Sequence, residues 1–167
     1  MSASLARGVL YVHSSPRALS PHVEWAAGRA LGRAVNFDWI DQPTLPGSQR
    51  ADYYWEGPAG TGAAIASALR GWEQLRYEVT EDAGNGTDGA RWMHTPNLGI
   101  FYAQTDTAGN VVIPEDRIRY AMDIAGASIL DLHRELRTAL GQDWDDELDV
   151  FRHAGENSPV VWLHRAG

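Results

Sequence analysis

The sequence predicts an α+β protein: a ferredoxin-like split βαβ antiparallel sheet, extended by a hairpin, a long helix and a C-terminal element. Three observations support this fold class. Alternating apolar patterns typical of strands recur along the chain, apolar stripes at helical spacing lie between them, and glycine and proline stand at the junctions. We expect residues 1–82 to form the split βαβ unit. Residues 83–167 are then the hairpin and helical C-terminal part of the same compact domain.

The first half of the chain alternates strands with helices. Strands are predicted at 8–13, 35–41, 51–57 and 75–81, from buried or alternating apolar residues. The first helix begins at Ser20, a good N-cap residue followed by Pro21, and ends at Gly32. The second helix follows the glycine loop "GPAGTG" and presents its core face through Ile65, Ala68, Leu69 and Trp72. The order is therefore β-α-β-β-α-β, which is the split βαβ pattern.

The second half begins with a loop at 82–90 and a strand pattern at 91–106, broken near Pro96. A turn and a short strand at 111–113 complete a hairpin that either extends the sheet or covers its open face. Pro114 then begins a helix of roughly 25 residues, with Gly126 as the point where it would break or kink. A short helix carrying Trp144 and Leu148 and a final strand at 160–164 follow.

The long helix has an apolar stripe whose members recur at spacings of four and three. The stripe consists of Ile118, Met122, Ala125, Ile129, Leu132, Leu136 and Ala139. Such spacing fits a helix packed on its own sheet, and it fits a helix–helix contact with another chain nearly as well. The pattern leaves both alternatives open.

Composition excludes several kinds of chemistry. The chain has a net charge of −8, which argues against nucleic acids and anionic membranes as partners. It contains no cysteine, and all 14 of its Lys and Arg residues are arginine, so thiolate and Schiff-base chemistry are excluded. Without a signal-peptide pattern or a long apolar run, we expect a cytoplasmic protein.

The glycine loop is the first candidate binding site. Gly57 and Gly62 have the spacing of a phosphate-binding Walker A loop, but alanines stand where that motif needs lysine and a hydroxyl residue. Backbone N–H groups at a helix N-terminus can still bind an anion. Gly57, Gly60, Thr61 and Gly62 are therefore candidate anion ligands, and a simple turn that begins the helix is the alternative.

A second candidate is a polar cluster of His13, His94, Asp38 and Glu78, which the predicted sheet could bring together for acid–base work. The alternative is a set of buried histidines and a sheet face whose acids pair with arginines such as Arg91. No metal-binding spacing is present, and we expect neither a metal nor a cofactor. The acidic run at 143–149 fails the calcium-loop pattern and is predicted to be a solvated helix face.

A third candidate lies on the first helix. Trp25 points away from the apolar stripe of that helix, beside Arg29. Tryptophan and arginine are enriched where proteins contact partners, so this pair is a candidate interface, including one between two copies of the chain. Burial under the C-terminal segments is the alternative.

The segments "GVLYVHSSP", "SPHVEWA", "GPAGTGAAIASALRGW", "LRYEVTED" and "RWMHTP" together resemble an actinobacterial family known as domain of unknown function 3145. The resemblance covers nearly the whole chain, from Gly8 to His164. It implies a setting near fatty-acid synthesis and assigns no activity, cofactor or site residue.

These observations favour a non-catalytic binding or regulatory protein that works through a protein partner or a small anionic metabolite. Acyl metabolism is the setting that the resemblance implies. Two alternatives are a small enzyme with a His/carboxylate site assembled by the fold, and a subunit of a larger complex.

Overall fold

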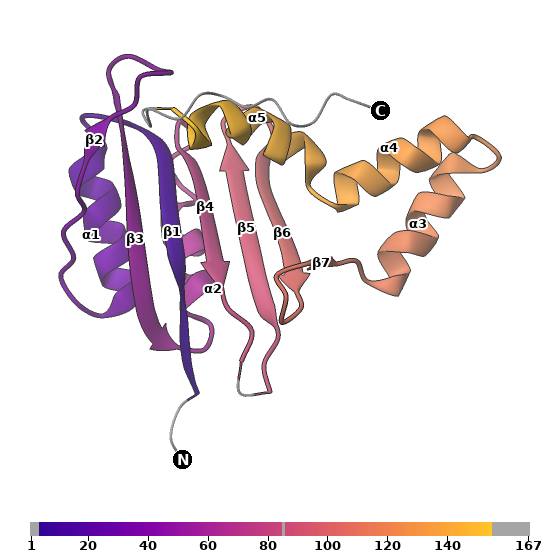
Figure 1. The fold of residues 1–167 in the computed structure, drawn as a ribbon, viewed down its shortest axis with the longest axis horizontal. Coiled ribbons are helices and arrows are strands. Elements are labelled where there is room, and N and C mark those ends of the chain that lie inside the picture. Colours follow the sequence, from indigo (N-terminus) through magenta and orange to yellow (C-terminus); the bar gives the residue numbers. More distant parts are fainter. Residues whose placement is uncertain (1–3, 85, 155–167) are drawn as a thin grey trace.

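The computed structural model, shown as a ribbon in Figure 1, describes residues 4–84 and 86–154. In this part of the chain, seven antiparallel strands form one sheet and five helices accompany it, so the protein is α+β. The order of strands across the sheet is β2-β3-β1-β4-β5-β6-β7. The strands are β1 (Leu5–Pro16), β2 (Ile40–Asp41), β3 (Ser48–Pro58), β4 (Arg76–Glu81), β5 (Gly89–Thr95), β6 (Gly99–Thr105) and β7 (Val111–Val112). The helices are α1 (Ser20–Leu31), α2 (Thr61–Leu69), α3 (Glu115–Ala125), α4 (Ile129–Ala139) and α5 (Gln142–Arg152).

Strand β1 lies at the centre of the first half of the fold and pairs with β3 on one side and β4 on the other. Its side chains alternate between two environments. Leu10 and Val12 are buried in the core shared with α1 and α2. Tyr11 and His13 face the opposite side of the sheet, which α5 partly covers (Figure 1). The sheet therefore separates a large apolar core from a more polar layer beneath α5.

The core on the α1–α2 side also contains Trp55, Ile65 and Leu69, each at most 1% exposed. A smaller core lies on the other face, where Met93 and Leu148 are fully buried. Because Leu148 belongs to α5 and Met93 to β5, this smaller core attaches the C-terminal helix to the sheet.

The predicted strand at 35–41 is wrong for most of its length, because only Ile40 and Asp41 are in a strand. The backbone N–H of Phe37 and the indole N–H of Trp39 both donate to Glu24 Oε1, at 2.9 and 2.8 Å. A buried donor needs one good acceptor, and here a side chain of α1 supplies it in place of a neighbouring strand. The alternating pattern therefore reflects packing beneath α1 rather than sheet pairing.

The predicted hairpin extends the sheet instead of covering it. In the pairing of β5 with β6, Gly89 lies opposite Thr105 at one end and Thr95 lies opposite Gly99 at the other. In the pairing of β4 with β5, Tyr77 lies opposite His94 and Glu81 lies opposite Ala90. The short strand β7 pairs with the end of β6.

The single long helix predicted after Pro114 is wrong, because the chain forms two helices instead. At Gly126 the backbone has φ 55° and ψ −121°, a conformation that glycine adopts far more readily than other residues. Ser128 then caps α4 by accepting a hydrogen bond from the Asp131 N–H at 3.2 Å. The two helices form an antiparallel hairpin that projects beyond the β7 edge of the sheet (Figure 1).

The predicted short helix is confirmed as α5, with Leu148 and Phe151 buried against the sheet. The predicted final strand at 160–164 lies outside the described residues. Within the described part of the chain, none of the helices combines the length and the apolar run needed to cross a bilayer.

Candidate functional site

A buried polar network joins two of the four residues of the predicted polar cluster. The His13 Nε2 atom on β1 lies 2.6 Å from Glu78 Oε2 on β4. These side chains are buried, with 3% and 6% of each residue exposed. Strand β1 has a bulge at this point, since its register against β4 passes from Val12–Tyr77 to Ser14–Arg76. Alternation along β1 places His13 on the same face as Tyr11, which stacks on its ring and is paired in register with Glu78.

Two arginines complete the surroundings of the Glu78 carboxylate. Arg152 on α5 donates to both of its oxygens, at 2.6 and 3.0 Å, and Arg91 on β5 donates to Oε1 at 2.9 Å. The same two guanidinium groups also donate to Asp145 Oδ1, at 2.7 and 2.8 Å. Two carboxylates are thus balanced by two arginines between the sheet and α5.

The network keeps Glu78 ionised. Burial raises the pKa of this carboxyl, but hydrogen bonds from His13 and Arg152 and the positive charge of Arg152 outweigh burial and hold the pKa well below its usual range. Because Glu78 Oε2 is an acceptor, the His13 Nε2 atom carries the hydrogen between them. Burial lowers the pKa of Arg152, but hydrogen bonds to Glu78 and Asp145 raise it above the ordinary value.

The other two members of the predicted cluster lie elsewhere. His94 pairs in register with Tyr77, the neighbour of Glu78 in sequence, and stacks on its ring at 5.2 Å. This histidine therefore lies on the α1–α2 side of the sheet, where its Nδ1 atom is 2.7 Å from the Leu75 carbonyl oxygen. Asp38 is exposed in the segment before β2. The four-residue cluster is thus not formed, and only its His13–Glu78 pair meets.

This network is better suited to joining α5 to the sheet than to catalysis. Both oxygens of Glu78 already accept hydrogen bonds from arginine, and neither Glu78 nor His13 is open to solvent. A general base must reach the proton it removes from a substrate. In this conformation α5 occupies the approach to both side chains.

The glycine loop begins α2, and its N–H groups have an acceptor within the chain. Gly60 N–H donates to Glu81 Oε1 at 2.9 Å, and Gly62 N–H donates to Glu81 Oε2 at 2.8 Å. The Thr61 hydroxyl donates to the Pro58 carbonyl oxygen at 2.7 Å. Gly57 packs against the Thr61 side chain. Any external anion would compete with the Glu81 carboxylate, and the predicted anion-binding role stays a prediction.

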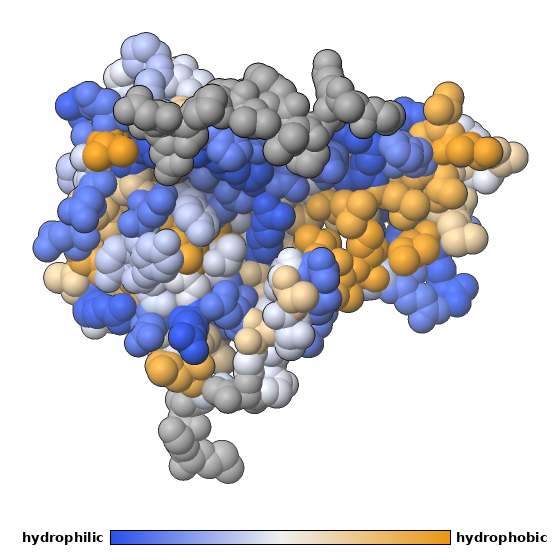
Figure 2. Space-filling view, in the orientation of Figure 1, coloured by the Kyte–Doolittle hydropathy of each residue, from blue (hydrophilic) through white to orange (hydrophobic). Residues whose placement is uncertain are grey.

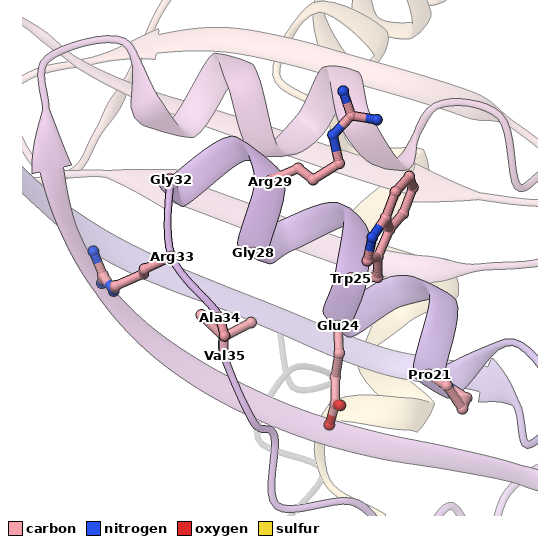
Figure 3. Close-up of a pocket in the computed structure, with 9 residues that line it drawn as sticks. All are labelled: Pro21, Glu24, Trp25, Gly28, Arg29, Gly32, Arg33, Ala34 and Val35. Atoms are coloured by element: carbon pink, nitrogen blue, oxygen red, sulfur yellow. The ribbon is translucent and has the colours of Figure 1, made fainter.

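A shallow pocket of about 480 Å³ lies along α1 and the segment that follows it. Figure 3 shows Trp25 and Arg29 on the same side of the helix, with the Arg29 guanidinium carbon 4.9 Å from the centre of a Trp25 ring. Glu24 points away from this pair, toward the other side of α1. The polar groups therefore diverge, whereas a small-molecule site usually has convergent ones. Trp25 is 61% exposed, and its role as an interface stays a prediction.

The α3–α4 hairpin carries the most exposed apolar surface. Its two helices meet through small side chains, since Ala121 and Ala125 are the buried residues of α3. Against the described part of the chain, no residue of α4 is fully buried. The large apolar side chains point outward, and we call them the hairpin surface: Ile118, Tyr120, Met122, Ile124, Ile129, Leu130 and Leu140. Figure 2 shows hydrophobic residues gathered over this part of the molecule.

Sequence reasoning missed several of these features. No local pattern distinguishes Arg152, and the prediction of a solvated face for the acidic run is wrong at Asp145, which takes part in the network. Glu81 was not recognised as the acceptor at the start of α2. These contacts depend on the register of the sheet and on the packing of α5, and local sequence patterns reveal neither of them.

Fold and surface together define an α+β protein with a projecting, apolar helical hairpin and a buried ion-pair network beneath its last helix. The chain belongs to the family described as protein of unknown function (DUF3145), whose model matches residues 9–165. No curated protein matches the chain. No solved structure matches it either.

Proposed function

We propose that this protein is a non-catalytic binding protein that docks onto a protein partner through the hairpin surface. The main evidence is the exposure of that surface. Ile129 and Leu130, at the end of the hairpin, are 82% and 81% exposed. Contiguous apolar patches on a folded protein usually mark interaction sites. A helical hairpin that projects from its own sheet presents such a patch without steric hindrance from the body.

The surroundings of the polar groups support a binding role over the enzyme alternative. The His13–Glu78 pair is closed off by α5 and saturated with hydrogen bonds from arginine. The N–H groups of the glycine loop are bound to Glu81. The features that suggested chemistry thus already have partners within the chain, while the large apolar side chains of the hairpin do not have a burial site in its described part.

We also propose that the first four strands with α1 and α2 form a ferredoxin-like split βαβ unit. Their order, β2-β3-β1-β4, supports this assignment, and β2 is reduced to two residues. Many unrelated functions occur on such sheets, so the unit supports the docking proposal only as a rigid base for the hairpin.

Site-specific photo-cross-linking tests the docking proposal. A photo-reactive amino acid replaces Leu130 in the full chain, in cells that naturally make the protein. The matched control position is Glu73, which is exposed in the turn after α2. We expect a discrete covalent adduct from position 130 and none from position 73. Failure to form adducts from positions 118, 122 and 130 alike would contradict docking through the hairpin.

The setting in acyl metabolism can be tested by the same experiment. The resemblance of the chain leads us to propose that a protein captured at the hairpin, other than a second copy of the chain, acts in fatty-acid synthesis or a related pathway. Mass spectrometry of the adduct identifies the cross-linked protein. A partner from an unrelated process would leave docking intact and remove this setting.

A further inference from the structure

The hairpin surface can supply a large part of the contact area of a stable complex. Its seven side chains are between 40% and 82% exposed. Tyr120 and Ile124 lie on the side of α3 opposite Ile118 and Met122, so a single interface can use at most five of the seven. At roughly 100 Å² of exposed area for each, these five offer on the order of 500 Å², and a stable complex buries about 800 Å² per partner. Most of an interface of ordinary size could therefore be formed by the hairpin alone.

Packing within the hairpin leaves one side of each helix free for another helix. Small residues lie between α3 and α4, where Ala121 and Ala125 are buried, so the two helices approach closely. Ile118 and Met122, by contrast, lie one turn apart on one side of α3 and are 40% and 58% exposed. A hairpin that was complete by itself would place its large apolar side chains inside, where they contribute most to stability.

The charges on the hairpin are complementary to those of a second hairpin. The exposed charged residues of α3 are three acids and one arginine: Glu115, Asp116, Asp123 and Arg119. On α4 the exposed residues of this kind are His133, Arg134 and Arg137. Both arginines of α4 form ion pairs within the chain, Arg134 with Asp131 and Arg137 with Asp146. These pairs are exposed and contribute little to stability, so either arginine can pair with an acid of another chain instead. Arg119 on α3 is likewise paired with Glu115. The exposed charges of α3 therefore have an acidic excess, carried by Asp116 and Asp123, and those of α4 are mainly basic, although Asp131 and Asp146 pair with its arginines.

We propose that the occupant of the hairpin surface is the hairpin of a second copy of this chain. The two copies are related by a two-fold axis, so that α3 of one copy lies against α4 of its partner and four helices form a bundle. A two-fold interface uses the same surface twice and must be self-complementary, as an acidic helix beside a basic one is. Apolar residues spaced alternately by three and four are typical of such bundles. This inference rests on the docking proposal above and names the partner.

The molecular mass of the native full-length protein, measured by light scattering and sedimentation over a range of concentrations, tests the proposal. We expect twice the chain mass of 18.4 kDa. Met122→Glu should raise the dimer dissociation constant by about tenfold or more, because it places a charge in an apolar contact. Ile129→Glu is a second variant with the same expectation. The matched control is Ile40→Glu on β2, since Ile40 and Met122 are both 58% exposed, and it should leave the dimer intact.

Charge reversal tests which helices meet. Asp116→Arg with Asp123→Arg on α3 should weaken the dimer, and adding His133→Glu with Arg134→Glu on α4 should restore it. A wild-type chain that stays monomeric at every concentration would overturn the proposal. So would a dimer that is indifferent to both Met122→Glu and Ile129→Glu. A monomer that still gives the Leu130 adduct with a different protein would overturn the dimer and leave docking standing.

Discussion

His13 and Glu78 lie 2.6 Å apart between β1 and β4, and Arg152 of α5 closes over the same carboxylate at 2.6 Å. Three segments that are distant in sequence therefore meet at one buried negative charge. Removing one partner from a buried ion pair leaves the other charges without compensation. Glu78 therefore joins α5 to two strands of the sheet, in addition to the apolar contacts of Leu148 and Phe151.

Glu78→Gln should lower the free energy of unfolding by about 3–5 kcal/mol, because Arg91 and Arg152 then lose a buried counter-charge. Urea unfolding followed by circular dichroism measures the loss. The control is Asp41→Asn, which removes an acid whose side chain is 77% exposed from its pair with Arg17. This control should cost about 1 kcal/mol or less. Equal losses in the two variants would contradict a special role for Glu78.

Stability should also fall in acid in a way that depends on Glu78. The pKa of this carboxyl is lower in the folded protein than its ordinary value of 4.5. Its contribution is therefore complete above that value and is lost as the pH falls from there through the folded-state pKa. Unfolding free energies measured from neutral pH downward should decline less steeply in Glu78→Gln than in wild type. Parallel curves would show that other carboxylates dominate acid unfolding.

Glu81→Ala should destabilise the start of α2 by about 1 kcal/mol, since Gly60 and Gly62 lose the acceptor of their N–H groups. Glu73→Ala, at an exposed position, serves as the control. The same variant also tests whether the glycine loop can bind an external anion once Glu81 no longer accepts its hydrogen bonds. Inorganic phosphate should raise the melting temperature of Glu81→Ala more than that of wild type, because only in the variant are the Gly60 and Gly62 N–H groups free of the Glu81 carboxylate. An equal response in both proteins would mean that phosphate does not bind at the glycine loop.

Gly126→Ala should loosen the hairpin, because alanine in this left-handed conformation is strained by about 1–3 kcal/mol. Hydrogen exchange of the α3 and α4 amides, read by mass spectrometry, should become faster while exchange of the sheet is unchanged. Gly71→Ala is the matched control, since Gly71 has open space around it and no left-handed backbone. The same acceleration in both variants would argue that the hairpin turn does not require glycine.

Much of the fold can be predicted from the sequence where a pattern depends only on local periodicity. The strand cores of β1, β3 and β4 and the end of α1 at Gly32 agree with the predicted ranges. The predicted N-cap at Ser20 is wrong by one residue, because Ser20 is already helical and Leu19 occupies the N-cap position. The segment at 35–41 misleads because Glu24, a residue of a neighbouring helix, takes the place of a pairing strand. The long helix misleads because the turn at 126–128 keeps the spacing of three and four between its two halves.

The candidate site was less predictable, because it depends on register. His94 would lie on the Glu78 side of the sheet if the pairing of β4 and β5 were shifted by one residue. The contribution of α5 to the network comes from Arg152, at its last residue, and from Asp145 within an acidic run. Neither residue type nor spacing distinguishes these positions from ordinary surface charges.

Gly141 joins the hairpin to α5, and a methyl group at this position would come within 2.7 Å of Met93 and 2.9 Å of Phe101. The root of the hairpin therefore presses directly on the smaller core, and α5 beyond it is fixed to the sheet by the Glu78 network. A hairpin fixed in this way loses little conformational freedom when it associates with another protein. For the docking that we propose, the hairpin needs little rearrangement, so we expect association to be limited by encounter.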